Sequence, residues 1–324
     1  MKKGYSETYY SGDYPKEYIL TEGDLLIGMD GEFNIARWKC SGALLNQRVC
    51  KLTAKVGTNE EYLRFAMSKS LKEIEKRTAF VTVKHLSAKE LNKLELDVPE
   101  LSKQDKIADT LSRLERIIEA REEELEKLDD LIKARFVEMF GSIYDNKYGY
   151  NVMTLQDVCE PIKDGTHQTP TYTEDTVNGF KFLSSKDVTS GKVDWDHLKY
   201  IPEELHNELY KRISPRKGDI LLAKNGTTGV AAIVDRDEVF DIYVSLALLK
   251  PLEMVTAEYL CSAVNSLETK HQFDHSLKGI GVPNLHLGEI KKTKIIVPPI
   301  ELQKQFADFV HQVDKSKVVV ASVR

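Results

Sequence analysis

Hydrophobic residues recur at heptad spacing between Lys103 and Phe140. They alternate in steps of four and three, interrupted only by Arg121, at Ile107, Leu111, Leu114, Ile118, Leu125, Leu128 and Ile132. This spacing places them on one side of a helix and favours packing against a second helix. No glycine or proline occurs before Gly141, a typical helix stop. We therefore predict one helix of roughly 55 Å that serves as a coiled-coil spacer. A long surface helix of a single globular domain is the alternative.

A second pattern occurs twice, at Gly23–Gly31 and again at Gly218–Gly226. In both places Gly-Asp leads through apolar residues into a glycine-containing turn, which predicts a short buried strand followed by a turn. An apolar-periodic segment that opens with Glu-Tyr-Leu comes later in each half, at Glu61–Leu63 and at Glu258–Leu260.

Further matched positions follow in the same order in both halves. They are Val83 with Val282, Leu86 with Leu285, Leu91 with Ile290, Val98-Pro99 with Val297-Pro298, Gln104 with Gln303, and Ile107-Ala108-Asp109 with Phe306-Ala307-Asp308. A period of about 200 residues is too long for a solenoid and fits two domains. We therefore interpret the chain as an internal duplication. Each copy is a mixed strand-and-helix domain that ends at a proline and continues into a long helix.

The two copies differ in extent. Tyr5 aligns with Tyr200, whereas the second copy begins near Tyr150, so we expect the first copy to lack an opening segment. The second helix, from Leu302 to Arg324, has about half the length of the first and is marginal without packing. We expect it to lie against the Lys103–Phe140 helix, antiparallel if the duplication has pseudo-twofold symmetry.

The predicted fold class is α+β, with two mixed α/β domains separated by long helices that form an antiparallel coiled coil. The predicted boundaries are 1–100 for the first domain, shortened at its start, 101–141 for the central helix, 142–300 for the second domain and 301–324 for the short distal helix.

Composition fits a folded protein, with 41% hydrophobic and 30% charged residues among 324. No apolar run approaches the roughly 20 residues that span a bilayer, and no apolar segment follows the opening lysines. We therefore expect a cytoplasmic protein without membrane contact. Cys40, Cys50, Cys159 and Cys261 show no C-x-x-C pairing, which favours buried free thiols. The net charge of −5 does not indicate nucleic-acid binding, so any DNA contact must come from local loops.

The duplicated Gly-Asp turn and a Pro-Pro-x-x-x-Gln step into a helix resemble the DNA-specificity (S) subunit of type I restriction-modification enzymes. The step is complete at Pro298–Gln303 and has one proline at Val98–Gln104. Leu44–Val49 and Asp164–Pro170 also look like segments of that family's target-recognition domains. The resemblance covers nearly the whole chain and includes the duplicated layout.

The resemblance implies a non-catalytic subunit without a cofactor, in which two target-recognition domains each read one half of a split site in double-stranded DNA. The helices hold the domains apart and bind methyltransferase (M) subunits, which carry S-adenosylmethionine and methylate adenine. A restriction and translocation (R) subunit completes the enzyme. One turn of B-DNA advances about 34–36 Å, so a stiff spacer suits two readers. Relative to the family, the first domain and the distal helix are shortened. Either the gene product is truncated or rearranged, or a second copy or a complementary fragment supplies the missing parts.

Two polar loops of the second half are candidates for DNA contact. In the first loop Gln168 could pair with adenine and Thr166 and Thr169 could hold phosphates, with Lys163 and His167 beside them. The alternative is an ordinary polar loop shaped by Gly165 and Pro170. The second loop is basic and rich in glycine and amides, and it supplies Lys224, Asn225, Thr227 and Thr228. It also fits a tight hairpin. It does not match the P-loop pattern.

In the first half the equivalent turn is acidic, with Asp30 and Glu32 able to accept from cytosine amino groups, and with Asn34 and Arg37 beside them. Two solvated acids on a surface turn are the alternative. Gln47 and Arg48 have suitable chemistry too, although Leu44, Leu45 and Val49 around them also fit a buried polar network.

Catalysis by this chain is not expected. Asp274 with Glu289-Ile290-Lys291 fits a nuclease triplet loosely, as chance allows in a chain with 51 acids, and His85 and His167 are isolated. The G-x-G-x-x-G and Asn/Asp-Pro-Pro-Tyr/Phe patterns of methyltransferases are absent. The hypothesis is sequence-specific DNA recognition, and the alternative is a coiled-coil scaffold or inactive partial specificity fragment that binds the methyltransferase. Salt-dependent, sequence-selective DNA binding separates the two.

Overall fold

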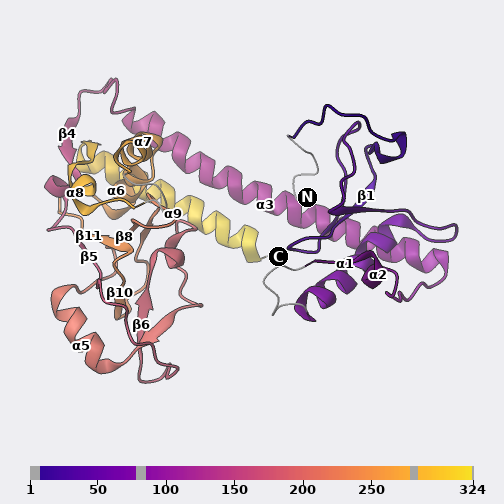
Figure 1. The fold of residues 1–324 in the computed structure, drawn as a ribbon. Coiled ribbons are helices and arrows are strands. Elements are labelled where there is room, and N and C mark those ends of the chain that lie inside the picture. Colours follow the sequence, from indigo (N-terminus) through magenta and orange to yellow (C-terminus); the bar gives the residue numbers. More distant parts are fainter. Residues whose placement is uncertain (1–7, 78–84, 278–283, 323–324) are drawn as a thin grey trace. The chain divides into compact units, whose positions relative to one another are not determined.

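The computed structural model describes residues 8–77, 85–277 and 284–322 (Figure 1). Tyr5, Val83, Val282 and Arg324, which the sequence analysis used, lie outside these residues. The chain forms two compact units, Met1–Arg121 and Glu122–Arg324. The division falls inside the long helix α3, so each unit contains part of that helix and is described separately below.

Both long helices are present where the sequence places them. Helix α3 (Leu101–Phe140) begins at Leu101 rather than Lys103 and is followed by Gly141, which has a φ of 73°. Positive φ is accessible to glycine at little cost, which explains the stop at this position. Helix α9 (Ile300–Ser322) follows the paired prolines. None of the helices in the described part of the chain combines the length and apolar character needed to cross a bilayer.

The first unit is built on a small antiparallel sheet. Strand β1 (Leu25–Gly28) lies between β2 (Ile35–Arg37) and β3 (Val49–Leu52). The 3-10 helix η1 (Lys16–Tyr18) precedes this sheet, and α1 (Glu60–Arg77) and the short α2 (Ala88–Leu91) follow it. The core of the unit joins one face of the sheet to α1 through buried Ile27, Met29, Phe33, Met67, Leu71 and Leu86.

The second unit repeats this sheet and extends it. Strand β8 (Ile220–Ala223) lies between β9 (Ala231–Ile233) and β11 (Leu246–Leu249), and β5 (Lys163–Asp164) adds a fourth strand beside β11. All pairs in this sheet are antiparallel. The register is also repeated, because Leu25 lies opposite Leu52 in the first unit and Ile220 lies opposite Leu249 in the second.

A second sheet in this unit was not predicted. Strand β6 (Phe180–Leu183) pairs in parallel with β10 (Phe240–Ile242) and antiparallel with β7 (Lys199–Ile201). The 3-10 helix η2 (Ser185–Val188) and helix α5 (Glu203–Arg212) accompany this sheet. A separate apolar core lies between the two sheets and includes Leu183, Val188, Trp195, Phe240, Leu221 and Leu246.

A third, two-stranded sheet of this unit joins the start and the end of the second repeat. Strand β4 (Asn151–Thr154) pairs with β12 (Lys294–Val297), which stands just before α9. Helices α4 (Leu155–Val158), α6 (Ala257–Val264), α7 (Leu267–Ser276) and α8 (Leu287–Lys292) pack around it. The core here is aromatic, with the rings of Phe136, Phe140, Tyr259 and Phe306 at centroid distances of 4.9–5.6 Å.

The duplication extends to individual hydrogen bonds of two buried glutamines. Gln303 accepts from Thr256 N at 2.9 Å and donates to the carbonyls of Met254 and Pro298 at 3.0 and 2.8 Å. The matched Gln104 makes the same three bonds, to Asn59 N at 2.9 Å and to the carbonyls of Gly57 and Pro99 at 3.2 and 2.7 Å. Each glutamine thereby ties the first turn of its long helix to the loop before α6 or α1.

The Gly-Asp turns are repeated in the same detail. Asp24 accepts from Thr21 N at 2.9 Å and forms an ion pair with Lys51 at 2.7 Å. Asp219 accepts from Arg216 N at 2.8 Å and forms an ion pair with Lys250 at 2.9 Å. These equivalent contacts confirm that the two halves are copies of one structural frame.

Helix α9 packs antiparallel on the later part of α3 in the second unit (Figure 1). Lys317, near the end of α9, forms an ion pair with Asp129 at 2.6 Å, whereas Phe306, near its start, contacts Phe140 at a ring distance of 5.4 Å. Burial opposes the charge of Lys317, but hydrogen bonds to Asp129 and Asp314 outweigh it and raise its pKa above the ordinary lysine value. The predicted antiparallel contact between the helices is therefore confirmed.

The earlier part of the predicted seam is less covered. Leu114 and Ile118 remain 51% and 45% exposed, in contrast to fully buried Phe140. Within the second unit, the ion pair between Lys317 of α9 and Asp129 lies on the later part of α3. The packing that the heptad spacing predicts for the whole seam is thus seen in its later part.

The four cysteines are free thiols, and burial is as predicted for two of them. Cys159 and Cys261 are buried, and burial raises the pKa of each thiol to about 12. Cys40 and Cys50 are only half-buried. The buried thiols stay protonated at neutral pH and act as small apolar groups in the core.

The glutamine contacts generate a stability prediction. Gln303→Ala removes three hydrogen bonds to backbone groups, so we expect the free energy of unfolding of the second unit to fall by about 2–4 kcal/mol. The two tryptophans, Trp38 and Trp195, lie in different units. Urea unfolding followed by fluorescence in a Trp38→Phe background therefore reports on the second unit. Gln312→Ala, at an exposed position of α9, is the matched control and should change stability by less than about 0.5 kcal/mol. Equal effects of the two substitutions would contradict the role of Gln303.

Candidate nucleic-acid interface

The two polar loops of the second half meet at a buried ion pair. Lys224 stands directly after β8 and Asp164 is the last residue of β5. Lys224 Nζ lies 2.6 Å from Asp164 Oδ2, and the two residues are only 6% and 7% exposed. Loops that are far apart in the sequence are thus brought together at one place in the fold.

This burial changes the role expected of Lys224. A buried ammonium ion that pairs with a carboxylate is held by that partner, and removing either one leaves an uncompensated charge. Its charge is therefore not presented to a phosphate in this structure. Lys224 positions the two loops relative to each other, and the side chains around it become the candidates for contact.

The first loop is held rigidly at its base. Arg212 donates to the carbonyl oxygens of Asp164 and of Gly165, the latter at 2.8 Å. Thr166 N donates to Ile242 O at 3.1 Å, and its carbonyl accepts from Val244 N at 2.9 Å. A Cβ at Gly165 would lie 2.0 Å from Ile242 O, so only glycine fits here.

Most of the predicted contact residues around this base are exposed, although Lys163 Nζ donates to Arg212 O at 3.3 Å. Lys163, His167, Gln168 and Thr169 are exposed, and Thr166 is half-buried. Thr166 Oγ1 accepts from Gln168 N at 3.2 Å, and His167 Nε2 lies 3.4 Å from Asp164 Oδ1. The loop therefore presents exposed polar side chains from a fixed frame, as groove or backbone contact requires.

The second loop connects two antiparallel strands, as the hairpin interpretation predicted, but through more residues than a tight turn has. Thr227 is exposed, and Asn225 and Thr228 are half-buried. Asn225 forms an antiparallel bridge with Asn284. No sequence pattern marks Asn284, although it stands directly before Leu285, the residue that matches Leu86 in the first half.

The equivalent place in the first unit holds a charged cluster. Asp30 bridges His85, whose Nδ1 lies 2.6 Å from Asp30 Oδ1, and Arg48 Nε lies 3.3 Å from Asp30 Oδ2. The Arg48 side chain is 72% exposed, and the adjacent Gln47 is exposed as well. Asn46 is also exposed, and its Oδ1 accepts from Arg48 N at 2.9 Å. This segment is a surface turn rather than a buried network.

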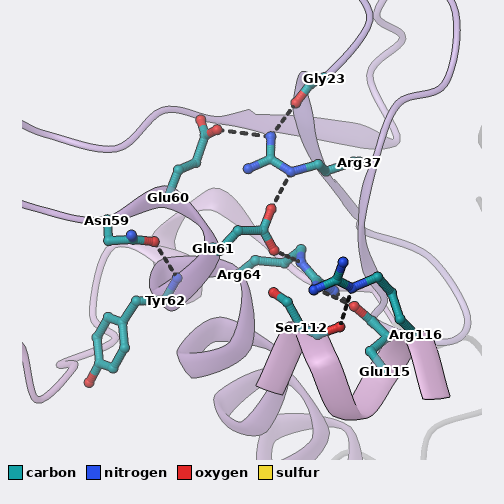
Figure 2. Close-up of polar contacts among 10 residues, drawn as sticks. All are labelled: Gly23, Arg37, Asn59, Glu60, Glu61, Tyr62, Arg64, Ser112, Glu115 and Arg116. Carbon is teal, nitrogen blue, oxygen red and sulfur yellow. Dashed lines mark hydrogen bonds and ion pairs between the residues drawn. The ribbon is translucent and has the colours of Figure 1, made fainter. Parts of the chain in front are cut away.

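Two predicted residues of the first half lie elsewhere. Figure 2 shows Arg37 held by Gly23 O at 2.7 Å, by Glu60 at 2.9 Å and by Glu61. Burial opposes its charge, but the hydrogen bonds that Arg37 donates to Glu61 and Glu60 outweigh burial and raise the pKa of Arg37. Asn34 Nδ2 donates to Glu32 Oε2 at 3.2 Å.

The cluster around Arg37 is structural. Glu61 also pairs with Arg64 at 2.8 Å, and Arg64 reaches Glu115 of α3 (Figure 2). The chain of ion pairs connects β2, α1 and α3 within the first unit. Arg37 is committed to this chain, and the structure does not bring it together with Arg48.

Metal chemistry has no support in the resolved side chains. Among the described residues, no group of three or more histidine, cysteine, aspartate or glutamate side chains is placed to hold a metal ion. The triplet of Asp274, Glu289 and Lys291 therefore gains no metal site from the structure.

Comparison with known proteins identifies the family. The model of the type I restriction modification DNA specificity domain matches residues 4–129 and again 147–319, so the duplication appears in the family match as well. The chain is 29% identical to the specificity subunit of the type I restriction enzyme EcoBI from Escherichia coli, over 96% of this chain and 70% of that protein. It is 24% identical to the specificity subunit of the type I restriction enzyme MjaVIII from Methanocaldococcus jannaschii, over 92% and 74% of the two chains.

Solved structures agree at the level of the fold. The S subunit of a type I restriction-modification system from M. genitalium matches with a TM-score of 0.53 at 15% identity, over 94% of this chain and 80% of that one. A chain from a study of complex assembly and conformational transition of the type I system matches with a TM-score of 0.52 at 18% identity, over 94% and 78%. With the family model matched over most of its length, the chain belongs to the DNA specificity subunits of type I restriction-modification enzymes, the non-catalytic members of those complexes.

Proposed function

We propose that this specificity subunit reads a split site in duplex DNA, with the first unit reading one half and the second unit the other. Methyltransferase and restriction subunits then act on the DNA that it selects. The observation that carries this proposal is the recurrence of one loop frame in both units with different side chains on it. A shared frame with different contact residues suits a site whose halves differ in sequence.

The frame rests on matched backbone hydrogen bonds. In the first unit Met29 N donates to Arg48 O at 2.9 Å, and Leu86 N donates to Met29 O at 2.7 Å. In the second unit Lys224 N donates to Ser245 O at 2.9 Å, and Leu285 N donates to Lys224 O at 2.8 Å. The residues that follow Met29 and Lys224 are therefore displayed in equivalent positions.

The displayed chemistry suits base and backbone contacts. In the second unit Gln168 and Asn225 carry amides that can pair with adenine, and the threonine hydroxyls can hold phosphates. In the first unit Arg48 can contact a phosphate or guanine, and Gln47 offers an amide beside it. Because the whole chain carries a net charge of −5, these local groups must supply the attraction.

We propose that the long helices act as a spacer and bind methyltransferase subunits. In this proposal residues 1–100 and 142–300 are the two target-recognition domains, and residues 101–141 and 301–324 are the helices that set their spacing. In this proposal the helix, with a rise of about 1.5 Å per residue, is the spacer between two readers of one duplex. The binding equilibria among this chain, the methyltransferase subunits and DNA would then determine which sites are modified.

The first prediction from this proposal tests the split site. Co-expression of this chain with its methyltransferase subunit, followed by genome-wide mapping of N6-methyladenine, should give a bipartite asymmetric motif, because two different loop sets are displayed. Expression of the methyltransferase subunit alone is the control and should give no motif.

Other results of that experiment contradict the proposal in distinct ways. A palindromic motif would indicate two copies of one recognition domain acting symmetrically. A stable complex without methylation would favour a scaffold or an inactive specificity fragment. Failure to form any complex would contradict a role as a working specificity subunit.

The second prediction concerns the fixed base of the first loop in the second unit. Gly165→Ala must displace the loop from Ile242, so we expect DNA affinity to fall and the motif to relax in one half-site only. Gly288→Ala is the matched control, because a Cβ there meets nothing within 4 Å. Quantitative binding to duplexes altered in one half-site measures the effect. An unchanged motif in the Gly165→Ala variant would show that this loop does not read DNA.

The third prediction separates two arginines of the first unit. Arg48→Ala removes an exposed cation, so the slope of log K against log salt concentration should fall by about one. Arg37→Ala instead breaks the ion pairs of Figure 2 and should lower thermal stability while leaving that slope unchanged in the folded protein. Binding titrations at several salt concentrations, with melting curves for both variants, distinguish the two roles. The reverse assignment of effects would contradict the predicted interface.

A further inference from the structure

Two amides at the second loop have oxygens that lack hydrogen-bond partners. Asn225 Oδ1 and Asn284 Oδ1 are both enclosed by neighbouring atoms, and neither accepts a hydrogen bond from residues 8–77, 85–277 or 284–322. Buried amide oxygens are almost always paired in folded proteins, so each exception calls for an explanation. The two residues face each other at one backbone bridge, so one shared explanation is favoured over two unrelated ones.

The bridge places the two side chains within reach of each other. Residues directly opposite in an antiparallel pair direct their side chains to the same face, with Cβ atoms about 4.5–5.5 Å apart. The first unit shows this contact directly, because Asp30 and His85 occupy the matched bridge and are hydrogen-bonded at 2.6 Å. The position therefore holds an interacting pair in one unit and an incomplete pair in the other.

The two asparagines have the means to satisfy each other but do not. Each amide carries two N–H donors and an oxygen acceptor, so one could donate to the other. Both oxygens nevertheless remain without a donor. The missing partner is therefore a hydrogen-bond donor that the residues described by the structure do not supply, and a bound base can supply it.

The hydrogen-bonding groups of each base indicate which base can supply the donor. In the major groove adenine offers an N6 amino donor beside the N7 acceptor, which matches the oxygen and the NH₂ of one side-chain amide. Guanine offers two acceptors there and would leave the amide oxygen unpaired. Cytosine offers its N4 amino donor without an adjacent acceptor for the NH₂ group. Adenine is the base that satisfies both ends of the amide.

We propose that Asn225 and Asn284 form a paired amide element that reads adenine in the half-site of the second unit. This assignment rests on the proposed function and adds to it a specificity residue, Asn284, and a base. Because the oxygens are enclosed in the free protein, the side chains turn outward when DNA binds. Asp30 in the first unit already has both oxygens engaged by His85 and Arg48, so the first unit reads its half-site by other contacts.

The proposal separates stability from recognition. A residue that is buried for structural reasons loses a hydrogen bond on substitution and destabilises the fold, as expected for Gln303. Replacement of an unpaired buried oxygen by an apolar group removes an unfavourable burial instead. The Asn225→Ala, Asn284→Ala double variant should therefore melt at the same temperature as the wild type or above it. Its preference for adenine should fall by roughly 10- to 100-fold at one or two positions of one half-site.

Replacement of Asn225 by aspartate gives a second test, in which the preferred base should change in a defined direction. Asn225→Asp keeps the acceptor and removes the donor, which matches the cytosine amino group and repels adenine N7. This variant should shift the preferred base from adenine towards cytosine at one position. Asn207→Ala, at an exposed asparagine of α5 in the same unit, is the control and should leave the motif unchanged.

The experiment uses the full chain in complex with its methyltransferase subunit. N6-methyladenine mapping gives the motif, a panel of duplexes with each base at each recognised position gives affinities, and melting curves give stability. A wild-type complex without sequence preference would overturn the proposed function together with this assignment. A selective wild type whose double variant keeps the same motif would overturn this assignment alone. Loss of stability with a uniform loss of affinity for all sequences would also overturn it, because that is the signature of a structural role.

Discussion

Each half of this protein depends on one buried glutamine at the start of a long helix. Gln104 is 1% exposed and Gln303 is fully buried, and each makes three hydrogen bonds to backbone atoms of two other segments. A side-chain amide is costly to bury unless all of its hydrogen bonds form. We therefore expect the three hydrogen bonds of each glutamine to form together. Within each unit the first turn of the helix is thereby fixed relative to the sheet, and the loops at the strand ends inherit a defined position.

The patterns that were predictable from the sequence are local. The heptad spacing gave α3 nearly to the residue, and Gly-Asp followed by apolar residues gave β1 and β8. The parallel pairing of β6 with β10 was not predictable, because it joins segments that are distant in the chain and carry no turn signal. The same limit applies to the pairing of β4 with β12 on either side of the second repeat.

The candidate interface was predictable in its location and less so in its individual residues. Both loops of the second half were selected from composition, and the fold brings them together. Lys224 and Arg37 were selected as candidates for DNA contact, yet their partners Asp164, Glu60 and Glu61 stand far away in the sequence and engage them. Composition identifies a polar loop, whereas only tertiary contacts decide which charges are already neutralised. Asn284 was missed for the complementary reason, since a single asparagine beside a matched leucine carries no pattern.

The contact between α3 and α9 adds a register constraint to the second unit. The contact includes aromatic packing of Phe136 and Phe140 on Phe306, and apolar packing of this kind tolerates small shifts along the helix axis. The buried Lys317 tolerates them less, because a shift by one turn would separate its ammonium ion from Asp129. A single buried polar group that specifies register is a well-attested use of such groups in coiled coils.

The glutamine contacts also bear on how such a protein can change over time. Every partner of Gln104 and Gln303 in these contacts is a backbone amide or carbonyl, so the joint between helix and sheet does not depend on which side chains the sheet and its loops carry. Loop residues can therefore be replaced without disturbing the joint, and a whole reading module can in principle be exchanged for another that presents the same backbone path. A rigid connection that ignores side-chain identity lets recognition diverge rapidly while the scaffold stays the same.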